Sequence, residues 1–288
     1  MPVCPCVNEN FPLLGKNLPT LSNNSIREIQ EALFLAGYYL EEPSDVYDEN
    51  TRAAIRQFQK DHGLAVDGVV RYHVWLKLAQ RIDALTVAQQ KIPAPQGNVT
   101  IVIDTFRRRI MILSDYQLHA QFPIAIGKAQ TPSPVGNWQI KNKAVNWGTG
   151  FGTRWMGLNV PWGVYGIHGT NKPWSIGSMA SHGCFRMWNK DVELIYPWIN
   201  HGTQVTVIGN AFGYTYGGIR PGRPSDIGSE VIALQKKLIR LGFYKGEADG
   251  LYGPGTEKAV KAMQKHYDLP VTGSMSLADY AALGINTH

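Results

Sequence analysis

One cysteine and two histidines lie close together in the middle of this chain, and they could carry out nucleophilic chemistry. Cys184 follows His182 by two residues, and His168 lies sixteen residues before the cysteine. A thiolate is a strong nucleophile, and an imidazole can take the thiol proton. Gly183 would let the backbone approach a substrate, with the N–H groups of residues 183 and 184 facing an oxyanion. Arg186 adds a positive charge that favours a thiolate or holds a substrate carboxylate. These residues predict acyl transfer through a cysteine.

Spacing alone leaves the identity of the base open. On an extended chain the side chain of His182 points to the same side as that of Cys184, whereas His168 needs the tertiary fold to reach it. Two interpretations compete with catalysis. Cys184 could be a buried small hydrophobic residue, or His168, His182 and Cys184 could bind zinc. His-x-Cys is poor chelate spacing and no fourth ligand is evident, so we expect neither a metal nor another cofactor.

Length and composition indicate a globular protein with two or three folding units. The chain has 288 residues, of which 44% are hydrophobic and 17% charged. It contains no apolar run long enough to span a bilayer, and its start lacks the features of a secretory signal. Residues 1–20, which include Cys4 and Cys6, are expected to form a flexible leader. Three cysteines do not make a disulfide framework.

The positive charge of the chain is concentrated in its middle. Residues 93–218 contain 10 Lys and Arg against 4 Asp and Glu, whereas residues 1–92 contain 9 against 11. A basic middle suits an anionic substrate or surface. Its densest basic run, Arg107–Arg109, reads as a hairpin tip, and nucleic-acid binding would need a broader basic stripe. We therefore expect no nucleic-acid partner.

The two ends of the chain are related by duplication. Residues 25–68 and 230–273 align without a gap at an offset of 205, and 13 of the 44 aligned positions are identical. The period is too long for a solenoid, so two copies of one small domain flank a different one. Each copy reads as three short helices. The first helix ends at Gly37 in the first copy, the second helix begins at Thr51 or Thr256 as N-cap, and the third carries Trp75 or Tyr280.

The repeated unit resembles the peptidoglycan-binding domain of bacterial wall hydrolases. The second copy carries the resemblance at Leu241–Tyr244, Asp249–Gly253 and Thr256–Gln264. The first copy departs from that pattern because Ser44–Asp48 replaces the glycines of its turn. The modules are expected at residues 21–92 and 226–288, and the resemblance implies that they bind the wall.

Between the modules the hydrophobic period changes to two. Strands are expected at residues 99–104, 109–113, 118–126, 137–140, 163–167 and 202–208, with one helix at residues 189–200. This pattern predicts a mainly β domain over residues 97–210, either a sandwich or a partly open barrel. A Gly/Pro linker is expected at residues 211–225. The fold class is therefore α+β and multidomain, with a β domain between two small three-helix modules.

The central domain resembles the bacterial L,D-transpeptidases. The resemblance rests on Ile167–Asn171, Ser181–Met187 and Asn189–Val192, and the Thr131–Gly136 loop also fits the family pattern. Phe185 departs from it, since an aliphatic residue is more usual there. The resemblance covers about residues 97–208.

This resemblance implies roles for particular residues. His168 would be the general base, oriented by the backbone carbonyl of Gly169, and Cys184 would form a thioester with the donor stem peptide. His182 and Gly183 would help to shape the oxyanion hole. Candidates for supporting the loop or contacting the substrate are Ser181, Arg186, Thr170 and Trp174. Trp174 is either a lid residue or a packing anchor.

The resemblance also implies the reaction. Cys184 would attack a tetrapeptide stem between meso-diaminopimelate and its terminal D-Ala, and the amine of a neighbouring stem would then form a 3→3 cross-link. Water as acceptor would give an L,D-carboxypeptidase instead. A non-catalytic wall-binding protein and a general cysteine peptidase are also compatible with the sequence. The implied partner is peptidoglycan in a cell wall, envelope or spore, and a carbapenem is expected to acylate Cys184.

Overall fold

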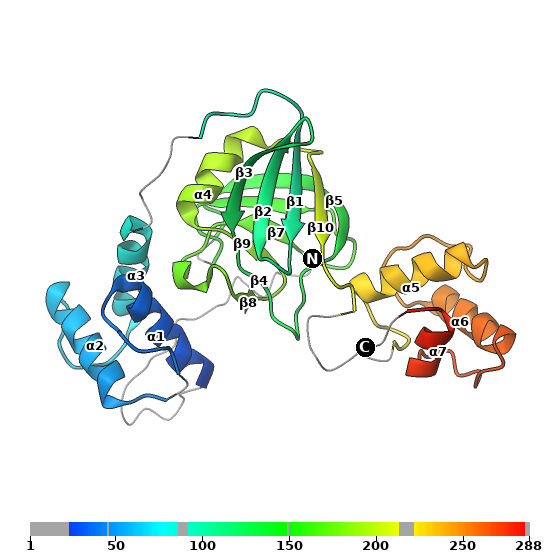
Figure 1. The fold of residues 1–288 in the computed structure, drawn as a ribbon, viewed down its shortest axis with the longest axis horizontal. Coiled ribbons are helices and arrows are strands. Elements are labelled where there is room, and N and C mark those ends of the chain that lie inside the picture. The colour runs from blue at the N-terminus through cyan, green and yellow to red at the C-terminus, as the bar shows by residue number, and fades with distance from the viewer. Residues whose placement is uncertain (1–22, 45, 86–91, 149, 213–221, 286–288) are drawn as a thin grey trace.

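The computed structural model describes residues 23–44, 46–85, 92–148, 150–212 and 222–285. A β unit lies in the middle, with helices α1–α3 on one side of it and α5–α7 on the other (Figure 1). The predicted leader and most of the predicted second linker lie outside the described residues. No helix among those described is long and apolar enough to cross a membrane.

In the described part of the chain, eight strands form one mixed sheet that curls into a half-barrel (Figure 1). The strands are β1 (Val99–Asp104), β2 (Arg109–Ser114), β3 (Gln117–Pro123), β5 (Gly136–Val145), β6 (Arg154–Leu158), β7 (Gly166–His168), β9 (Phe185–Arg186) and β10 (Gln204–Ile208). Their order is β3-β2-β1-β10-β5-β6-β7-β9. The β1–β10 and β7–β9 pairs are parallel, and the others are antiparallel. A short parallel pair, β4 (Ile126–Gly127) and β8 (Met179–Ser181), lies outside this sheet.

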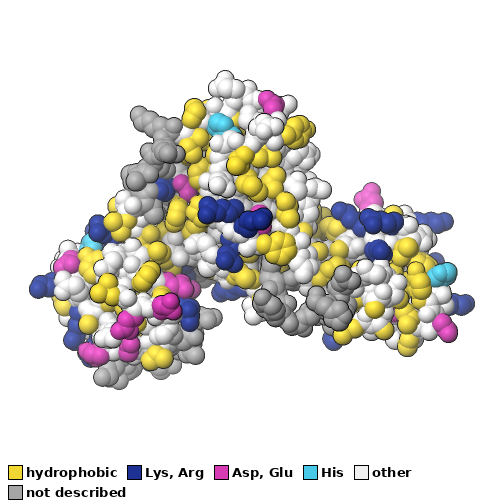
Figure 2. All heavy atoms as spheres, viewed as in Figure 1, with side chains coloured by type: hydrophobic (Ala, Val, Ile, Leu, Met, Phe, Trp, Pro, Cys, Tyr) yellow, Lys and Arg dark blue, Asp and Glu magenta, His cyan; other side chains and the backbone are white. Residues whose placement is uncertain are grey.

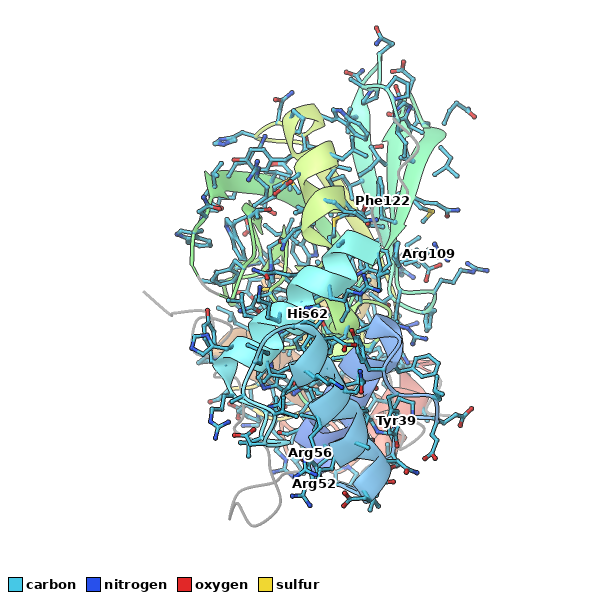
Figure 3. All side chains as sticks on the ribbon, turned by 90° about the vertical axis from the view of Figure 1, so that its left-hand side faces the viewer. Tyr39, Arg52, Arg56, His62, Arg109 and Phe122 are labelled. Atoms are coloured by element: carbon cyan, nitrogen blue, oxygen red, sulfur yellow. The ribbon has the colours of Figure 1, made fainter. Side chains whose placement is uncertain are left out.

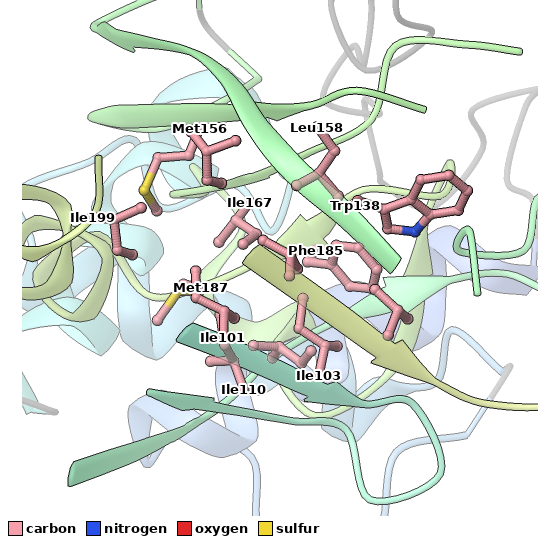
Figure 4. Close-up of a cluster of buried hydrophobic side chains, with 14 of the residues drawn as sticks. Ile101, Ile103, Ile110, Trp138, Met156, Leu158, Ile167, Phe185, Met187 and Ile199 are labelled. Carbon is pink, nitrogen blue, oxygen red and sulfur yellow. The ribbon is translucent and has the colours of Figure 1, made fainter. Parts of the chain in front are cut away.

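The core of the half-barrel lies between the two arms of the curled sheet. β1 and β2 contribute Ile101, Ile103 and Ile110 from one arm, and β6 and β7 contribute Met156, Leu158 and Ile167 from the other (Figure 4). Helix α4 (Asn189–Ile195) closes this core with Val192 and Ile195, both fully buried. Burial of this apolar surface is the main force that holds the strands together.

The first module consists of α1 (Asn23–Ala36), α2 (Glu49–Asp61) and α3 (Tyr72–Leu85) (Figure 3). Gly37 follows α1 with a φ of 85°, as expected of a glycine that ends a helix. The prediction of Thr51 as an N-cap is wrong, because α2 begins earlier. Asp48 is its N-cap and accepts a hydrogen bond from the backbone N–H of Thr51 at 2.7 Å. The Thr51 hydroxyl is instead buried and accepts from Gln30 at 2.8 Å.

The second module consists of α5 (Ser229–Arg240), α6 (Pro254–His266) and α7 (Leu277–Ala282). The N-cap of α6 is Gly253, so the prediction of Thr256 as a cap is also wrong. Identical residues of the two copies make the same bonds. Gln235 donates to the Thr256 hydroxyl at 3.0 Å, and the Tyr252 hydroxyl donates to the Gly273 carbonyl at 2.9 Å, as Tyr47 does to Gly68 at 2.8 Å. The shared residues therefore maintain the fold of each copy.

Both modules pack against the β unit. In the second module, Ser229 accepts a hydrogen bond from the Val135 backbone N–H at 2.8 Å, and Ile232 enters the core of the half-barrel. In the first module, Trp75 stacks on Trp174 of the β unit with ring centroids 4.9 Å apart. On the face shown in Figure 2, acidic side chains gather on the first module and basic ones on the other two units.

Most predicted elements are present, and the differences have physical reasons. The predicted strand at residues 118–126 ends at Pro123, and the chain then enters β4. The predicted helix at residues 189–200 ends at Ile195, and a 3-10 turn with a proline follows it. Strand β6 was not predicted, because its side chains are buried on both faces and show no alternation.

Candidate active site

Strands β7 and β9 bring the predicted base and nucleophile to one face of the sheet. They pair in parallel, with Ile167 opposite Phe185 and His168 opposite Arg186. Cys184 directly precedes β9, two residues before Arg186, so the alternation of an extended chain places it on the face of His168 and Arg186. Ile167 and Phe185 point the other way, into the core (Figure 4).

Two aromatic side chains, Phe151 and Trp155, contact both the Cys184 thiol and the His168 ring and form an aromatic wall between them. Phe151 contacts the His168 ring edge to face at 5.0 Å, and Trp155 stacks on the same ring at 5.7 Å. Cys184 clusters with these two aromatic residues, and Trp147 packs against both of them from outside. Both Cys184 and His168 are fully buried. The wall therefore places the two side chains in one apolar environment from which water is excluded.

The hydrogen bonding of His168 determines which ring nitrogen can act as a base. Its Nδ1 lies 2.5 Å from the carbonyl oxygen of Gly169. A carbonyl oxygen only accepts, so Nδ1 carries a proton in this hydrogen bond, and Nε2 is the nitrogen left for proton transfer. Nε2 is buried and has no hydrogen-bond partner among the described residues. The hydrogen bond thus orients the ring so that Nε2 is the nitrogen that could act as a base.

Asn189, the first residue of α4, holds the segment that follows His168. Its Oδ1 accepts hydrogen bonds from the backbone N–H groups of Thr153 and Thr170 at 3.1 and 3.2 Å. Its Nδ2 donates to the carbonyl of Thr170 at 2.9 Å. A Cβ at Gly169 would lie 2.2 Å from Asn189 Oδ1, so only glycine fits against this amide. Sequence reasoning assigned Asn189 no role, although it belongs to the signature that carries the family resemblance.

The turn before Cys184 is organised by Ser181. The Ser181 hydroxyl donates to the carbonyl of Cys184 at 2.6 Å and accepts from the backbone N–H of Gly183 at 3.0 Å. Gly183 has a φ of 111°, and a Cβ there would lie 2.6 Å from the ring of Tyr165. The Gly183 N–H, a predicted oxyanion donor, is thus engaged with Ser181 in this conformation.

The predicted Thr131–Gly136 loop lies against the same turn. The Ser181 carbonyl accepts hydrogen bonds from the Lys128 backbone N–H at 3.0 Å and from the Thr131 hydroxyl at 3.2 Å. Ser133 accepts from the backbone N–H of Gly127 at 2.9 Å. The loop therefore supports the turn that leads into Cys184.

The remaining predicted residues lie around this centre with different exposures. Thr170 is buried, and its hydroxyl accepts a hydrogen bond from the Lys172 backbone N–H at 3.0 Å. Arg186 is buried, and together with His182 it lines a cavity beside the first module. Trp174 borders the same cavity and belongs to the buried cluster of the first module. Substrate contact by these residues stays a prediction.

The described residues contain no group of three or more His, Cys, Asp and Glu side chains that could hold a metal ion. In that part of the chain, His168, His182 and Cys184 therefore do not come together as a chelating set. Cys184 and His168 instead share contacts with Phe151 and Trp155.

Comparison with protein families identifies all three units. Residues 98–207 match the model of the L,D-transpeptidase catalytic domain. Residues 22–76 and 227–283 each match the model described as "Putative peptidoglycan binding domain". The duplication deduced from the sequence is thus confirmed as two copies of one domain family.

Individual relatives agree with these families. The chain is 46% identical over 86 residues to "Putative L,D-transpeptidase YkuD" of Bacillus subtilis, a match to 30% of this chain and 51% of that protein. It is 38% identical over 107 residues to the protein of the same name in Bacillus licheniformis, covering 37% of this chain and 64% of that protein. The chain thus spans less than two thirds of the length of either relative. Among solved structures, the catalytic domain from the E. faecium L,D-transpeptidase matches 39% of this chain and 98% of its own length, with 23% identity and a TM-score of 0.35.

Proposed function

Since the chain carries an L,D-transpeptidase catalytic domain between two peptidoglycan-binding domains, we propose that it cross-links peptidoglycan stem peptides by acyl transfer through Cys184. One observation carries this proposal. The His168 imidazole has a buried Nε2 without a partner among the described residues, and Phe151 and Trp155 contact both this ring and Cys184.

In the first half-reaction, His168 Nε2 takes the thiol proton of Cys184. The thiolate attacks the carbonyl carbon that joins the L-centre of meso-diaminopimelate to the terminal D-Ala of a tetrapeptide stem. The C–N bond then breaks, the imidazolium gives its proton to the leaving amine, and D-Ala departs. The product is a thioester on Cys184. The Gly169 carbonyl stabilises the imidazolium through Nδ1 throughout this step.

In the second half-reaction, an amine of a neighbouring stem attacks the thioester carbonyl. His168 takes a proton from this amine, the C–S bond breaks, and the imidazolium gives the proton to the departing thiolate, which returns both residues to their starting state. The new amide is a 3→3 cross-link between two diaminopimelate residues.

The turn at residues 182–184 would stabilise the negative oxygen of both tetrahedral intermediates. The Gly183 N–H donates to the Ser181 hydroxyl in this conformation. It would have to leave that hydroxyl before it could donate to the substrate oxygen, because one N–H does not bond two acceptors well. His182 lies in the same turn and is assigned to this hole, not to the base, since His168 already has the required hydrogen bond.

Burial of the thiol favours an amine over water as acceptor. Cys184 and His168 are fully buried behind Phe151 and Trp155, so a thioester formed there would be shielded from hydrolysis. An L,D-carboxypeptidase, in which water resolves the thioester, is the alternative, and it uses the same residues.

The flanking modules would hold the enzyme on its insoluble substrate. Both match the peptidoglycan-binding family, and an excess of basic residues in the central unit suits an anionic wall. The protein would thus act in a cell wall, envelope or spore.

Incubation of the protein with tetrapeptide muropeptides tests this function. We expect release of D-Ala and formation of 3→3 dimers, detected by mass spectrometry of the products. D-Ala release without dimers would establish the carboxypeptidase, and no D-Ala release would leave only a wall-binding role.

A further inference from the structure

A cavity of about 130 Å³ lies where the first module meets the β unit, beside the turn that carries Cys184. Its charged lining comes from both units. Helix α1 of the first module contributes Glu28 and Glu31, and the β unit contributes Lys128, Lys172, Arg186 and His182. The cavity thus combines carboxylates from one unit with cationic groups from the other.

The module that supplies the carboxylates packs directly against the β unit. Trp174, on the wall of the cavity, is buried in the core of the first module and stacks on Trp75. The ammonium group of Lys172 lies 3.3 Å from a carboxylate oxygen of Glu28, and its side chain is only 9% exposed. Glu31, one helical turn further along α1, therefore faces the β unit across a fixed interface.

Comparison of the two modules shows that these carboxylates are not part of the repeated scaffold. At the offset of 205, Ala233 replaces Glu28 and Lys236 replaces Glu31 in the second module. The residues that maintain the fold, such as Gln30 and Gln235, are unchanged. The copy beside the cavity is thus the one that carries acidic residues at both positions.

We propose that this cavity binds the side-chain end of the donor stem's third residue, a carbon atom that carries both an ammonium group and a carboxylate. This inference rests on the proposed function, which supplies meso-diaminopimelate as that residue. Glu31 receives the ammonium group, and Arg186 and Lys128 receive the carboxylate. A zwitterion needs both signs of charge within a few ångströms, and the interface of the two units provides them.

The position of the cavity fits this ligand. His182 and Arg186, which line it, lie two residues before and two residues after Cys184. In meso-diaminopimelate, three methylene groups separate the L-centre, whose carbonyl is attacked, from the zwitterionic end. The side chain of a donor whose carbonyl lies at Cys184 would pass the turn that bears this residue to enter the cavity. The first module then contributes directly to donor selection as well as to wall binding.

The test compares two donors and one substitution. One donor is a tetrapeptide stem with a free side-chain amine, and the other carries the same amine acetylated, which removes its charge. For E31Q we expect KM for D-Ala release to rise about tenfold with the free amine, the effect of losing one charge-assisted hydrogen bond. With the acetylated donor, E31Q and the unmodified protein should have the same KM. Glu42→Gln, which changes an exposed carboxylate of the same module, should leave both values unchanged.

Equal KM values for E31Q and the unmodified protein with the free-amine donor would overturn the proposal. An equal rise with both donors would also overturn it, because the carboxylate would then only hold the two units together. If the unmodified protein releases no D-Ala from either donor, the proposed function itself fails.

A binding measurement on the unmodified protein separates failure of the subsite from failure of the proposed function, and it does not require any variant to fold. Calorimetry on the unmodified protein should detect free meso-diaminopimelate and not pimelate, which has the same chain and carboxylates but no amines. Equal binding of both compounds, or binding of neither, would contradict the subsite whatever the outcome of the turnover assay.

Discussion

Replacing Asn189 with alanine tests whether the segment after His168 must be held for catalysis. The substitution removes three hydrogen bonds, two from backbone N–H groups to Oδ1 and one from Nδ2 to the carbonyl of Thr170. Thr170 is only 1% exposed, so its N–H and carbonyl would lose their partners inside the protein. At roughly 1 kcal/mol for each bond, the free energy of unfolding should fall by about 2–4 kcal/mol.

The effect on catalysis should be larger than the loss of stability alone implies. Without Asn189, the peptide between Gly169 and Thr170 would lose the hydrogen bond at its N–H, so its carbonyl would hold the His168 Nδ1–H less firmly. A misplacement of about 1 Å can cost roughly 100-fold in rate, so kcat for D-Ala release should fall by about that factor. The pH–rate profile should also change, because the population of the required imidazole form changes. A purely structural role would lower the active fraction and leave the profile unchanged.

Two further variants sharpen the experiment. Asn189→Asp retains both acceptor bonds and loses the Nδ2 donor, so its rate should lie between those of the alanine variant and the unmodified protein. Asn137→Ala removes an exposed bond from Thr206 at 3.1 Å on a distant strand and should change stability by less than about 0.5 kcal/mol. A normal rate and an unchanged pH profile for Asn189→Ala would refute this reasoning.

Three other predictions concern the thiol, its base and the first module. His168→Ala should reduce D-Ala release far more than His182→Ala, and the reverse order in a steady-state assay would show that the base is wrongly assigned. A carbapenem should increase the intact mass by one adduct, and Cys184→Ser should form none; an adduct on that variant would place acylation elsewhere. Hydrogen bonds from Thr51 hold the pKa of Asp48 below its ordinary value of 3.8. The stability that this carboxylate contributes is therefore complete above that pH and lost as the pH falls through the lowered pKa. Asp48→Asn should flatten the acid side of the unfolding curve of the first module, and an unchanged curve followed by circular dichroism would contradict the assignment.

The proximity of Cys184 and His168 could be predicted because the candidate residues are close in sequence or belong to a known signature, and they lie on or beside paired strands. Cys184 and its glycine are adjacent, and the resemblance of the His168 segment to a known signature supplied the second group. The duplication was also readable, since the buried glutamines and tyrosines that maintain each module recur at a fixed offset.

Other features depend on tertiary contacts that no local pattern reveals. Strand β6 places Trp155 against the imidazole ring. Because the side chains of β6 are buried on both faces, its sequence shows no alternation of polar and apolar residues. Asn189 acts on a backbone segment about twenty residues away. The N-caps of α2 and α6 were misplaced because Thr51 and Thr256 bond to buried glutamines of the preceding helices, a role that sequence does not distinguish from capping.

No sequence pattern indicated that the first module packs against the β unit. Trp174 was open to two interpretations, a lid residue or a packing anchor, and its stacking on Trp75 joins it to a module about one hundred residues earlier in the chain. Because of this contact, the first module lies beside the turn that carries Cys184.

The most direct test of the central claim is a muropeptide digest with the unmodified protein and with Cys184→Ala. We expect D-Ala release, a thioester-sized mass increase and 3→3 dimers with the unmodified protein, and none of the three with the variant, while both proteins still sediment with isolated cell walls. D-Ala release that persists in Cys184→Ala would contradict that claim.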